Sequence, residues 1–200
     1  MAKEQETNGA GEKESKLPET KAFQDEYTRD FIKSTKETEE GFYTYESKTG
    51  GYSMLFPVNA ELDEMFYERV KESFESIDFG ENTAGNFTYD VTLFYENKPS
   101  MTDLEVNLSV LSDMQGYTGN YKETNGNETL IKYASEIHEI SKGDNAYFTF
   151  GFIHSEKNKE KGISMVYTAT CTNEKQKCEI DKVKEENKAI RLMKSIEFKN

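Results

Sequence analysis

This 200-residue chain contains only two cysteines and two histidines. The two cysteines, Cys171 and Cys178, are separated by the polar sequence TNEKQK. A disulfide between them would pin the turn after a strand, and an even cysteine count favours a bridge in a protein outside the cytosol. The alternative is a pair of reduced thiols. A zinc site would need more ligands, and only His138 and His154 could supply them.

The two histidines lie outside any known catalytic or metal-binding motif. His138 and His154 are the only residues that titrate near neutral pH without a shift. Each falls in a predicted strand, where a packed or exposed histidine is the ordinary finding. The sequence also lacks G-x-S-x-G, H-E-x-x-H, Walker-type and G-x-G-x-x-G patterns. We therefore predict that the protein is not an enzyme, with no catalytic residues, no metal site and no cofactor.

Carboxylates and tyrosines are the remaining candidates for a binding surface. Two acidic clusters could hold a hard cation weakly: Glu37, Glu39 and Glu40, and Asp63 and Glu64. They lack the carboxylate order of a calcium loop, so we interpret them as solvated charge. Tyrosine is favoured at binding surfaces, and five tyrosines are considered: Tyr43, Tyr45, Tyr52, Tyr117 and Tyr121. Most should still lie in the core, because the chain has no Trp and few Leu to fill it.

The acidic composition limits the partners of the protein. Acidic residues outnumber Lys and Arg 38 to 25, which gives a formal net charge of −13. Nucleic acid is excluded, because phosphate binding needs a basic surface. The charge equally disfavours direct adsorption to anionic lipid headgroups, and no run approaches the roughly 20 apolar residues that cross a bilayer. We expect contact with a membrane only through a lipid anchor.

Residues 1–19 are too polar to fold by themselves. Leu17 is their only large apolar residue after Met1, so burial cannot offset the entropy of ordering them. One interpretation is an ordinary ragged terminus. The other is a disordered tether, which resembles the spacer of exported bacterial lipoproteins between a lipidated cysteine and the folded domain. In that case a signal peptide has been removed, and a leader and a cysteine precede Lys3 in the full-length gene product.

Two long strands, at residues 146–154 and 163–172, form the centre of the predicted fold. Phe148, Phe150 and Phe152 alternate with the residues between them, which is a period-two pattern typical of a strand. Both strands carry bulk on both faces, which favours a central position covered on each side. The connecting sequence SEKNKEKG is too charged to bury, so it should form a solvated hairpin loop.

The other hydrophobic patterns predict three helices and further strands. Helices are expected at residues 20–36, 101–115 and 182–194. Ser100, in a capping box with Asp103, should cap the second helix, Gly116 should end it, and Asp181 should cap the third. Residues 117–128 are rich in turn formers. Strands are expected at residues 42–46, 52–56, 72–80, 86–96 and 130–140, with residues 195–198 as a short final strand or packed tail.

Both ends of the predicted domain resemble those of PsbP-like domains. Gly51–Pro57, after an aromatic strand, is similar to their G-Y-S-F-x-x-P opening, and Met193–Phe198 to their closing x-x-S-I-x-F. The resemblance spans about residues 41–198, but the Trp that often follows the Pro is missing, and the 61–80 segment is long. It implies antiparallel strands with helices on the faces, and no ligand residue, because members share a scaffold rather than a site. The Lys-, Glu- and Asn-rich style is similar to lipoproteins of Bacillus-type bacteria.

These patterns predict an α+β fold. We expect an antiparallel β-sheet of about six to seven strands packed with α-helices, a PsbP-like α/β/α sandwich over residues 20–200. The first functional hypothesis is a non-enzymatic extracytoplasmic lipoprotein that binds an unknown envelope protein or a small ligand. The second is a small-molecule or cation carrier with a tyrosine-lined pocket, which convergent polar groups would favour. The third, a dispersed carboxylate site of an enzyme, would need two buried, close carboxylates with shifted pKa values. The oligomeric state is not indicated.

Overall fold

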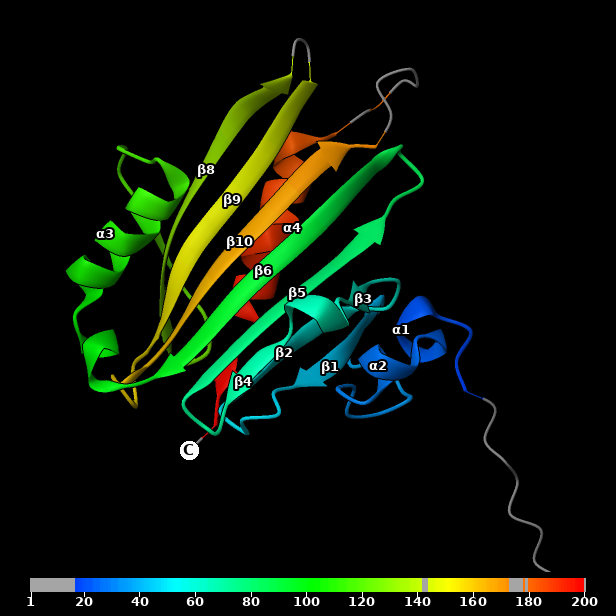
Figure 1. Cartoon of the computed structure of the whole chain (residues 1–200), viewed down its shortest axis with the longest axis horizontal. Coiled ribbons are helices and arrows are strands. Elements are labelled where there is room, and N and C mark those ends of the chain that lie inside the picture. Colours follow the sequence, from blue (N-terminus) through cyan, green and yellow to red (C-terminus); the bar gives the residue numbers. More distant parts are fainter. Residues whose placement is uncertain (1–16, 142–143, 173–177, 179, 200) are drawn as a thin grey trace, which may run out of the picture.

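A large antiparallel sheet dominates the computed structural model, which describes residues 17–141, 144–172, 178 and 180–199. Its strands are β3 (Glu61–Leu62), β4 (Glu68–Val70), β5 (Phe74–Asn82), β6 (Phe87–Asn97), β7 (Lys122–Asn125), β8 (Thr129–Ser141), β9 (Asp144–Ser155) and β10 (Lys161–Cys171). Their order is β3-β5-β6-β10-β9-β8-β7, and β4 pairs with β5 off this path (Figure 1). The predicted α+β class with an antiparallel sheet is confirmed, and the large sheet has eight strands where about six to seven were expected.

The strands β9 and β10 occupy the middle of this sheet, as the sequence predicted. Val166 of β10 lies between Phe150 of β9 and Thr92 of β6 in the register. Phe150 and Phe152 are buried on one face of the sheet, and Ile153 is buried on the other. Both faces of β9 are therefore covered, which explains why its sequence carries bulky residues at consecutive positions.

A second, three-stranded sheet corrects the expectation of one sheet. It consists of β1 (Phe42–Glu46), β2 (Tyr52–Pro57) and β11 (Glu197–Phe198), in the order β1-β2-β11. Tyr52 and Phe56 of β2 pack against Tyr95 and Phe79 of the large sheet, with ring centroids 5.2 and 4.9 Å apart. Every residue of β2 is buried, so this hairpin stacks on the face of the large sheet instead of extending its edge.

Helices cover opposite faces of the large sheet. On one face, α3 (Leu104–Gln115) packs Leu108 and Leu111 onto Phe150 and Phe152. On the other, α4 (Lys182–Lys194) packs against β9 beside the small sheet, where a Cβ added to Gly151 would lie 3.1 Å from Met193 Sδ. Within the described ranges, none of the helices is long and apolar enough to cross a membrane.

The N-terminal helix prediction was wrong in its length. Residues 20–36 contain two single turns, α1 (Lys21–Gln24) and α2 (Glu26–Arg29), and no helix after them. Asp25 separates them in an extended conformation, and its side chain caps α2 by accepting a hydrogen bond from Thr28 N at 2.7 Å. Beyond α2 the chain forms a β-bridge through Ile32 to Tyr45. An aspartate that favours capping therefore outweighs the helical spacing of the aromatic residues.

Three further details differ from or refine the predictions. Pro99–Thr102 forms a short 3-10 helix, η2, so Asp103 rather than Ser100 caps α3 and accepts from Val106 N at 3.1 Å. Gly116 ends α3 with a φ of 65°, as expected. The turn-rich segment also contains the edge strand β7, whose polar residues have no apolar face to signal a strand. The last residues form the predicted final strand, β11.

Candidate functional site

One part of the large sheet carries no α-helix, and only the short 3-10 helices η1 (Glu64–Phe66) and η2 contact its margins. On the face that α3 covers at β8 and β9, the strands β10, β6 and β5 are open (Figure 1). We call this area the open strip. Its side chains are the alternate residues that point away from the main core: Phe74, Ser76, Asp78, Thr88, Asp90, Thr92, Phe94, Ser164, Val166 and Thr168. All of them are at least partly exposed.

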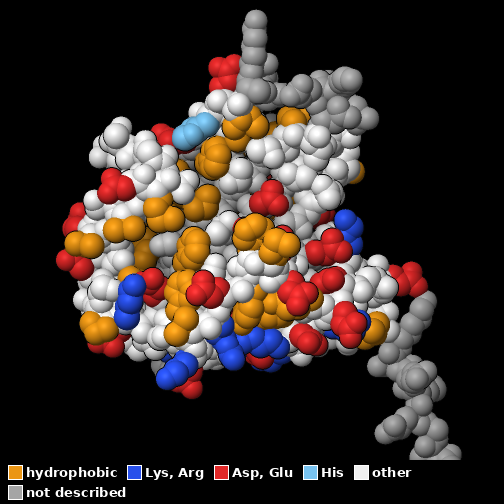
Figure 2. All heavy atoms as spheres, in the orientation of Figure 1, with side chains coloured by type: hydrophobic (Ala, Val, Ile, Leu, Met, Phe, Trp, Pro, Cys, Tyr) orange, Lys and Arg blue, Asp and Glu red, His pale blue; other side chains and the backbone are white. Residues whose placement is uncertain are grey.

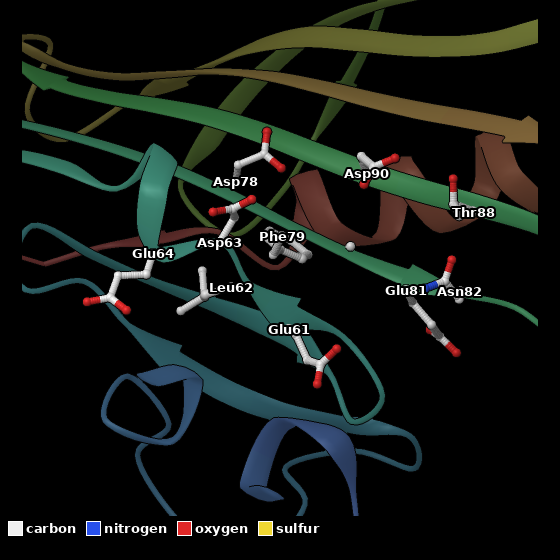
Figure 3. A pocket seen from close by; sticks show the side chains of 11 residues that line it. Glu61, Leu62, Asp63, Glu64, Asp78, Phe79, Glu81, Asn82, Thr88 and Asp90 are labelled. Atoms are coloured by element: carbon white, nitrogen blue, oxygen red, sulfur yellow. The ribbon is translucent and has the colours of Figure 1, made fainter. Parts of the chain in front are cut away.

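A groove of about 330 Å³, the carboxylate groove, lies at the β5 side of the open strip. Its acidic side chains come from β3, β5, β6 and the 3-10 helix η1 (Glu64–Phe66), with its capping residue: Glu61, Asp63, Glu64, Asp78, Glu81 and Asp90 (Figure 3). The strand register assembles them, because Gly80 of β5 pairs with Asp90 of β6, and Leu62 of β3 pairs with Phe79 of β5. Residues far apart in the sequence thus line one opening.

Hydrogen bonds fix two of these carboxylates. Asp78 accepts from Thr92 Oγ1 at 2.6 Å, across the β5–β6 pair. Asp63 accepts from Met65 N at 2.9 Å, which caps η1, and the Asp63 N–H donates to the carbonyl oxygen of Asp78 at 2.8 Å. Asp63 and Asp78 are therefore held as neighbours by the backbone.

The carboxylate groove carries uncompensated negative charge. Burial raises the pKa of Asp78, the hydrogen bond from Thr92 opposes that shift, and the charge of Asp63 adds to it. Burial and the charge of Asp78 raise the pKa of Asp90. Among the described residues, no Lys or Arg forms an ion pair with five of the carboxylates, namely Glu61, Asp63, Glu64, Asp78 and Asp90. A cationic group brought into the groove would relieve this repulsion.

The arrangement attracts positive charge without enclosing a metal ion. No group of three or more His, Cys, Asp or Glu side chains in the described part of the chain is placed to hold one. Of the two acidic clusters noted in the sequence, Asp63 and Glu64 lie at the groove. The other is engaged elsewhere, since Glu37 accepts from Gly41 N at 2.8 Å and Glu39 pairs with Arg191 at 2.5 Å.

Comparison with known proteins gives the family. A family described as "Putative lipoprotein YvcA" matches residues 18–197. A relative from Bacillus subtilis (strain 168), with the same description, is 33% identical over 189 residues, which cover 91% of this chain and 78% of the relative. The chain belongs to the YvcA family. Both the open strip and the carboxylate groove lie inside the range that matches the YvcA family.

The two cysteines of this YvcA-family chain form the disulfide that the sequence favoured. Cys171 ends β10, and its Sγ is bonded to that of Cys178 at 2.06 Å, with Cα atoms 5.9 Å apart. The sequence contains no other cysteine. Cys178 packs against the main core, so the bridge fastens the chain that leads from β10 towards α4.

Neither histidine joins a site. His138 is exposed on β8, where its Nε2 lies 3.0 Å from Glu136 Oε2. His154 is buried near the end of β9, and its Nε2 lies 2.9 Å from the carbonyl oxygen of Lys159. That contact requires the proton on Nε2, since a carbonyl oxygen only accepts. Both positions agree with the packed or exposed roles expected for them.

The tyrosines considered as surface candidates do not line the carboxylate groove. Tyr43, Tyr45 and Tyr52 are buried in the main core. Tyr117 and Tyr121 are half-buried and contact Phe150 edge-on, with centroids 5.3 and 6.1 Å from its ring. The carboxylate groove is therefore not the tyrosine-lined pocket of the second hypothesis. A smaller pocket of about 140 Å³, between the large sheet and α4, is lined by two other tyrosines, Tyr147 and Tyr167, and by Lys182 and Glu185.

Buried polar clusters are the functional-looking feature that sequence reasoning missed. Glu75 is fully buried, and its carboxylate accepts from Tyr45 Oη, Tyr67 Oη and Lys48 N at 3.2, 3.2 and 2.9 Å. Under α4, Tyr167 donates to the buried Glu185. The sequence did hold a signal for Glu75. It shares one face of the predicted strand with Ile77 and Phe79, and that face is buried in β5. The Glu75 cluster is closed by its own partners, whereas Tyr167 and Glu185 line a pocket of about 140 Å³ between the large sheet and α4.

Proposed function

We propose that this chain is the extracytoplasmic part of a lipid-anchored protein of the cell envelope, and that it acts by binding. The observation that carries the proposal is the match of residues 18–197 to a family described as a lipoprotein, with a Bacillus relative of the same description. The Cys171–Cys178 disulfide supports a compartment outside the reducing cytosol. The polar composition of residues 1–19 is that of a tether between an anchor and a domain.

The decisive experiment uses the full-length gene product in a Bacillus host. We expect metabolic labelling with a palmitate analogue to mark the protein, and fractionation to recover it with membranes, accessible to protease on intact protoplasts. Replacing the first cysteine upstream of Lys3 with Ala should abolish both the label and the membrane association. An unlabelled protein in the cytosol fraction that keeps two free thiols would overturn the proposal.

We further propose that the scaffold is PsbP-like. The two segments that carry the resemblance lie side by side, since Ser53 pairs with Glu197 and Tyr52 with Phe198. Leu55 N also donates to Ser195 Oγ at 3.0 Å. This contact supports the idea that the two motifs are the halves of one structural unit. An experimental structure, compared by superposition with PsbP-like domains, tests it; a different strand order in the large sheet would exclude it.

Binding without catalysis is the role that the carboxylate groove supports best. Asp78 and Asp90 have raised pKa values and lie near each other, as a dispersed acid site would require, but Asp90 is exposed and Asp78 only half-buried. Open carboxylates of this kind can attract a cationic group. The cation-carrier alternative has less support, because among the described residues no three of the groove's carboxylates are placed to hold a metal ion together. Calorimetric titration with Ca²⁺ or Mn²⁺ tests it, and micromolar affinity would revive it.

A further inference from the structure

The helix α3 has a second apolar face that no other part of the described chain covers. Its buried stripe, with Leu108 and Leu111, packs on the large sheet. Val106, Val110 and Met114, spaced four residues apart, lie on another side and are 54%, 52% and 59% exposed. A helix in a monomer normally keeps one apolar stripe and a polar opposite face. The second stripe therefore marks a surface available for binding.

The open strip supplies the opposite wall. Phe74 of β5 and Phe94 of β6 line a groove of about 450 Å³ together with the exposed stripe of α3, and Met101 and Ser164 line it as well. We call this the apolar groove. Figure 2 shows hydrophobic side chains over α3 and over the neighbouring sheet surface on the same face. Exposed apolar side chains gathered around one groove mark a candidate interaction site.

The dimensions of the open strip fit one α-helix. From β10 to β5 it covers two interstrand spacings, or about 10 Å. A helix with its side chains is about 10–12 Å across, and neighbouring helices pack about 8–10 Å apart. A helix lying beside α3 would therefore extend the existing helix layer from β9 to β5.

Charge changes along the open strip. Asp78 follows Phe74 by four residues on the same face of β5, and Asp90 precedes Phe94 by four on β6, so each carboxylate lies about 13 Å from its phenylalanine. The lysine that lines the apolar groove, Lys98, is already paired with Glu96 at 2.6 Å. The open strip is thus apolar beside α3 and negatively charged at the carboxylate groove.

We propose that the open strip binds an amphipathic basic helix of another protein. Its apolar side would fill the apolar groove, and Lys or Arg residues about nine positions further along, roughly 13 Å at 1.5 Å per residue, would reach Asp78 and Asp90. The charge complementarity selects this partner over an acidic one, since a Lys or Arg ends the repulsion between the two carboxylates. The inference rests on the proposed binding function and names the chemistry of the partner.

The test uses the purified chain and a fluorescein-labelled amphipathic Leu/Lys peptide of about 18 residues, long enough to cover both features. Two further peptides serve as controls: one of the same composition with the Leu and Lys order scrambled, and one with Glu in place of Lys. Fluorescence anisotropy should show the amphipathic basic peptide binding about tenfold or more tightly than either. Equal binding of the scrambled peptide, or no binding, would overturn the proposal.

Variants locate the binding. Val106→Gln/Val110→Gln and Asp78→Asn/Asp90→Asn should each weaken the amphipathic peptide about tenfold. The matched controls are Val183→Gln, at a residue 68% exposed on α4, and Glu40→Gln/Glu156→Gln, which changes the net charge equally at exposed residues elsewhere. Both controls should bind as the parent chain does. Equal losses in the controls would show non-specific attraction to an acidic protein and refute the assignment.

The same variants distinguish the proposed helix from two other possible occupants of the open strip, a second copy of this chain and a lipid surface. If the open strip joins two copies of this chain, sedimentation should show a dimer that Val106→Gln/Val110→Gln dissociates, which would replace the proposed partner. If it binds lipid, the parent chain should float with phosphatidylglycerol vesicles, and the variant should not. Because the peptide assay does not depend on lipidation, failure of peptide binding leaves membrane attachment untouched, and failure of lipidation in cells leaves the peptide result standing.

Discussion

At the scale of single residues, Glu75 is a buried carboxylate that needs hydrogen-bond donors from several parts of the chain. It is fully buried on β5, and two tyrosine hydroxyls and a backbone N–H donate to it. Burial, followed by the charge of Glu75, raises the pKa of Tyr45 and of Tyr67. A buried network of this kind stabilises a fold only while every donor keeps its acceptor.

Replacing Glu75 with Leu should therefore destabilise the protein although the volume is nearly kept. The change leaves the hydroxyls of Tyr45 and Tyr67 and the N–H of Lys48 without an acceptor. We expect a loss of about 1–3 kcal/mol in the free energy of unfolding, measured by urea denaturation. Glu72→Leu, at an exposed position nearby, is the control and should change stability little. Equal stabilities of the two variants would contradict this description of the cluster.

Asp90 gives a prediction about pH. The surrounding protein partly desolvates its carboxyl although the residue is exposed overall, and together with the charge of Asp78 this raises its pKa above the ordinary value of 3.8. A carboxyl whose pKa is raised in the folded state releases its proton more readily when unfolded, so its ionisation costs stability as pH rises through the folded pKa. Asp90→Asn should thus unfold at a higher urea concentration than the parent at pH 7, and lose that advantage below the ordinary pKa.

The control for Asp90→Asn is Asp113→Asn, at an exposed carboxyl of α3 outside the carboxylate groove. It loses the same unit of charge, and its stability difference from the parent should vary less with pH. The opposite result, a penalty for Asp90→Asn at pH 7 that persists in acid, would mean that Asp90 accepts a stabilising contact in the folded state.

At the scale of elements, strongly patterned segments were predictable and others were not. The phenylalanines of β9 and the stripe of α3 identified their elements because burial alone dictates those patterns. The break at Asp25 was missed, since the aromatic spacing of residues 20–36 continues across it and only the capping contact to Thr28 reveals it. The division into two sheets was missed as well. The sequence of β2 shows that the strand is buried, but not whether it stacks on the face of the large sheet or pairs within it.

The candidate site was predictable only in part. Asp63 and Glu64 stood out as an acidic pair in the sequence, and both lie at the carboxylate groove. Asp78 and Asp90 did not, because each is a polar residue that alternates with apolar ones along its strand. Their meeting depends on the β5–β6 register, which places Gly80 opposite Asp90 and which no local pattern encodes.

The disulfide yields a prediction at this scale. It joins the end of β10 to the segment before α4, and the two cysteines are seven positions apart in the sequence. Mass spectrometry without reductant should show the chain two hydrogens lighter than the dithiol. Cys171→Ser/Cys178→Ser should lower the free energy of unfolding by about 2 kcal/mol in the chain-entropy account. Addition of reductant should destabilise the parent by a similar amount and leave the variant unchanged; a parent insensitive to reductant would contradict the bridge.

At the scale of the whole molecule, the last strand closes the fold onto the first hairpin. The C-terminal segment packs the fully buried Ile196 into the main core and pairs β11 with β2, the strand that stacks on the large sheet. It also places Lys199 Nζ 2.9 Å from Glu46 of β1. Residues 144 to 153 positions apart are thereby joined, and the small sheet depends on the last few residues of the chain.

Truncation after Lys194 should consequently have a large effect for so few residues. It removes a buried isoleucine, whose loss alone costs about 2–5 kcal/mol, and exposes the edge of β2. We expect a fall of at least that size in the free energy of unfolding, followed by circular dichroism during urea denaturation. Removal of residues 1–16, which the sequence predicts to be part of a polar tether, should leave the unfolding curve unchanged. If the C-terminally truncated protein unfolds like the parent, the small sheet does not depend on β11. If the N-terminal deletion changes the unfolding curve, the tether prediction is wrong.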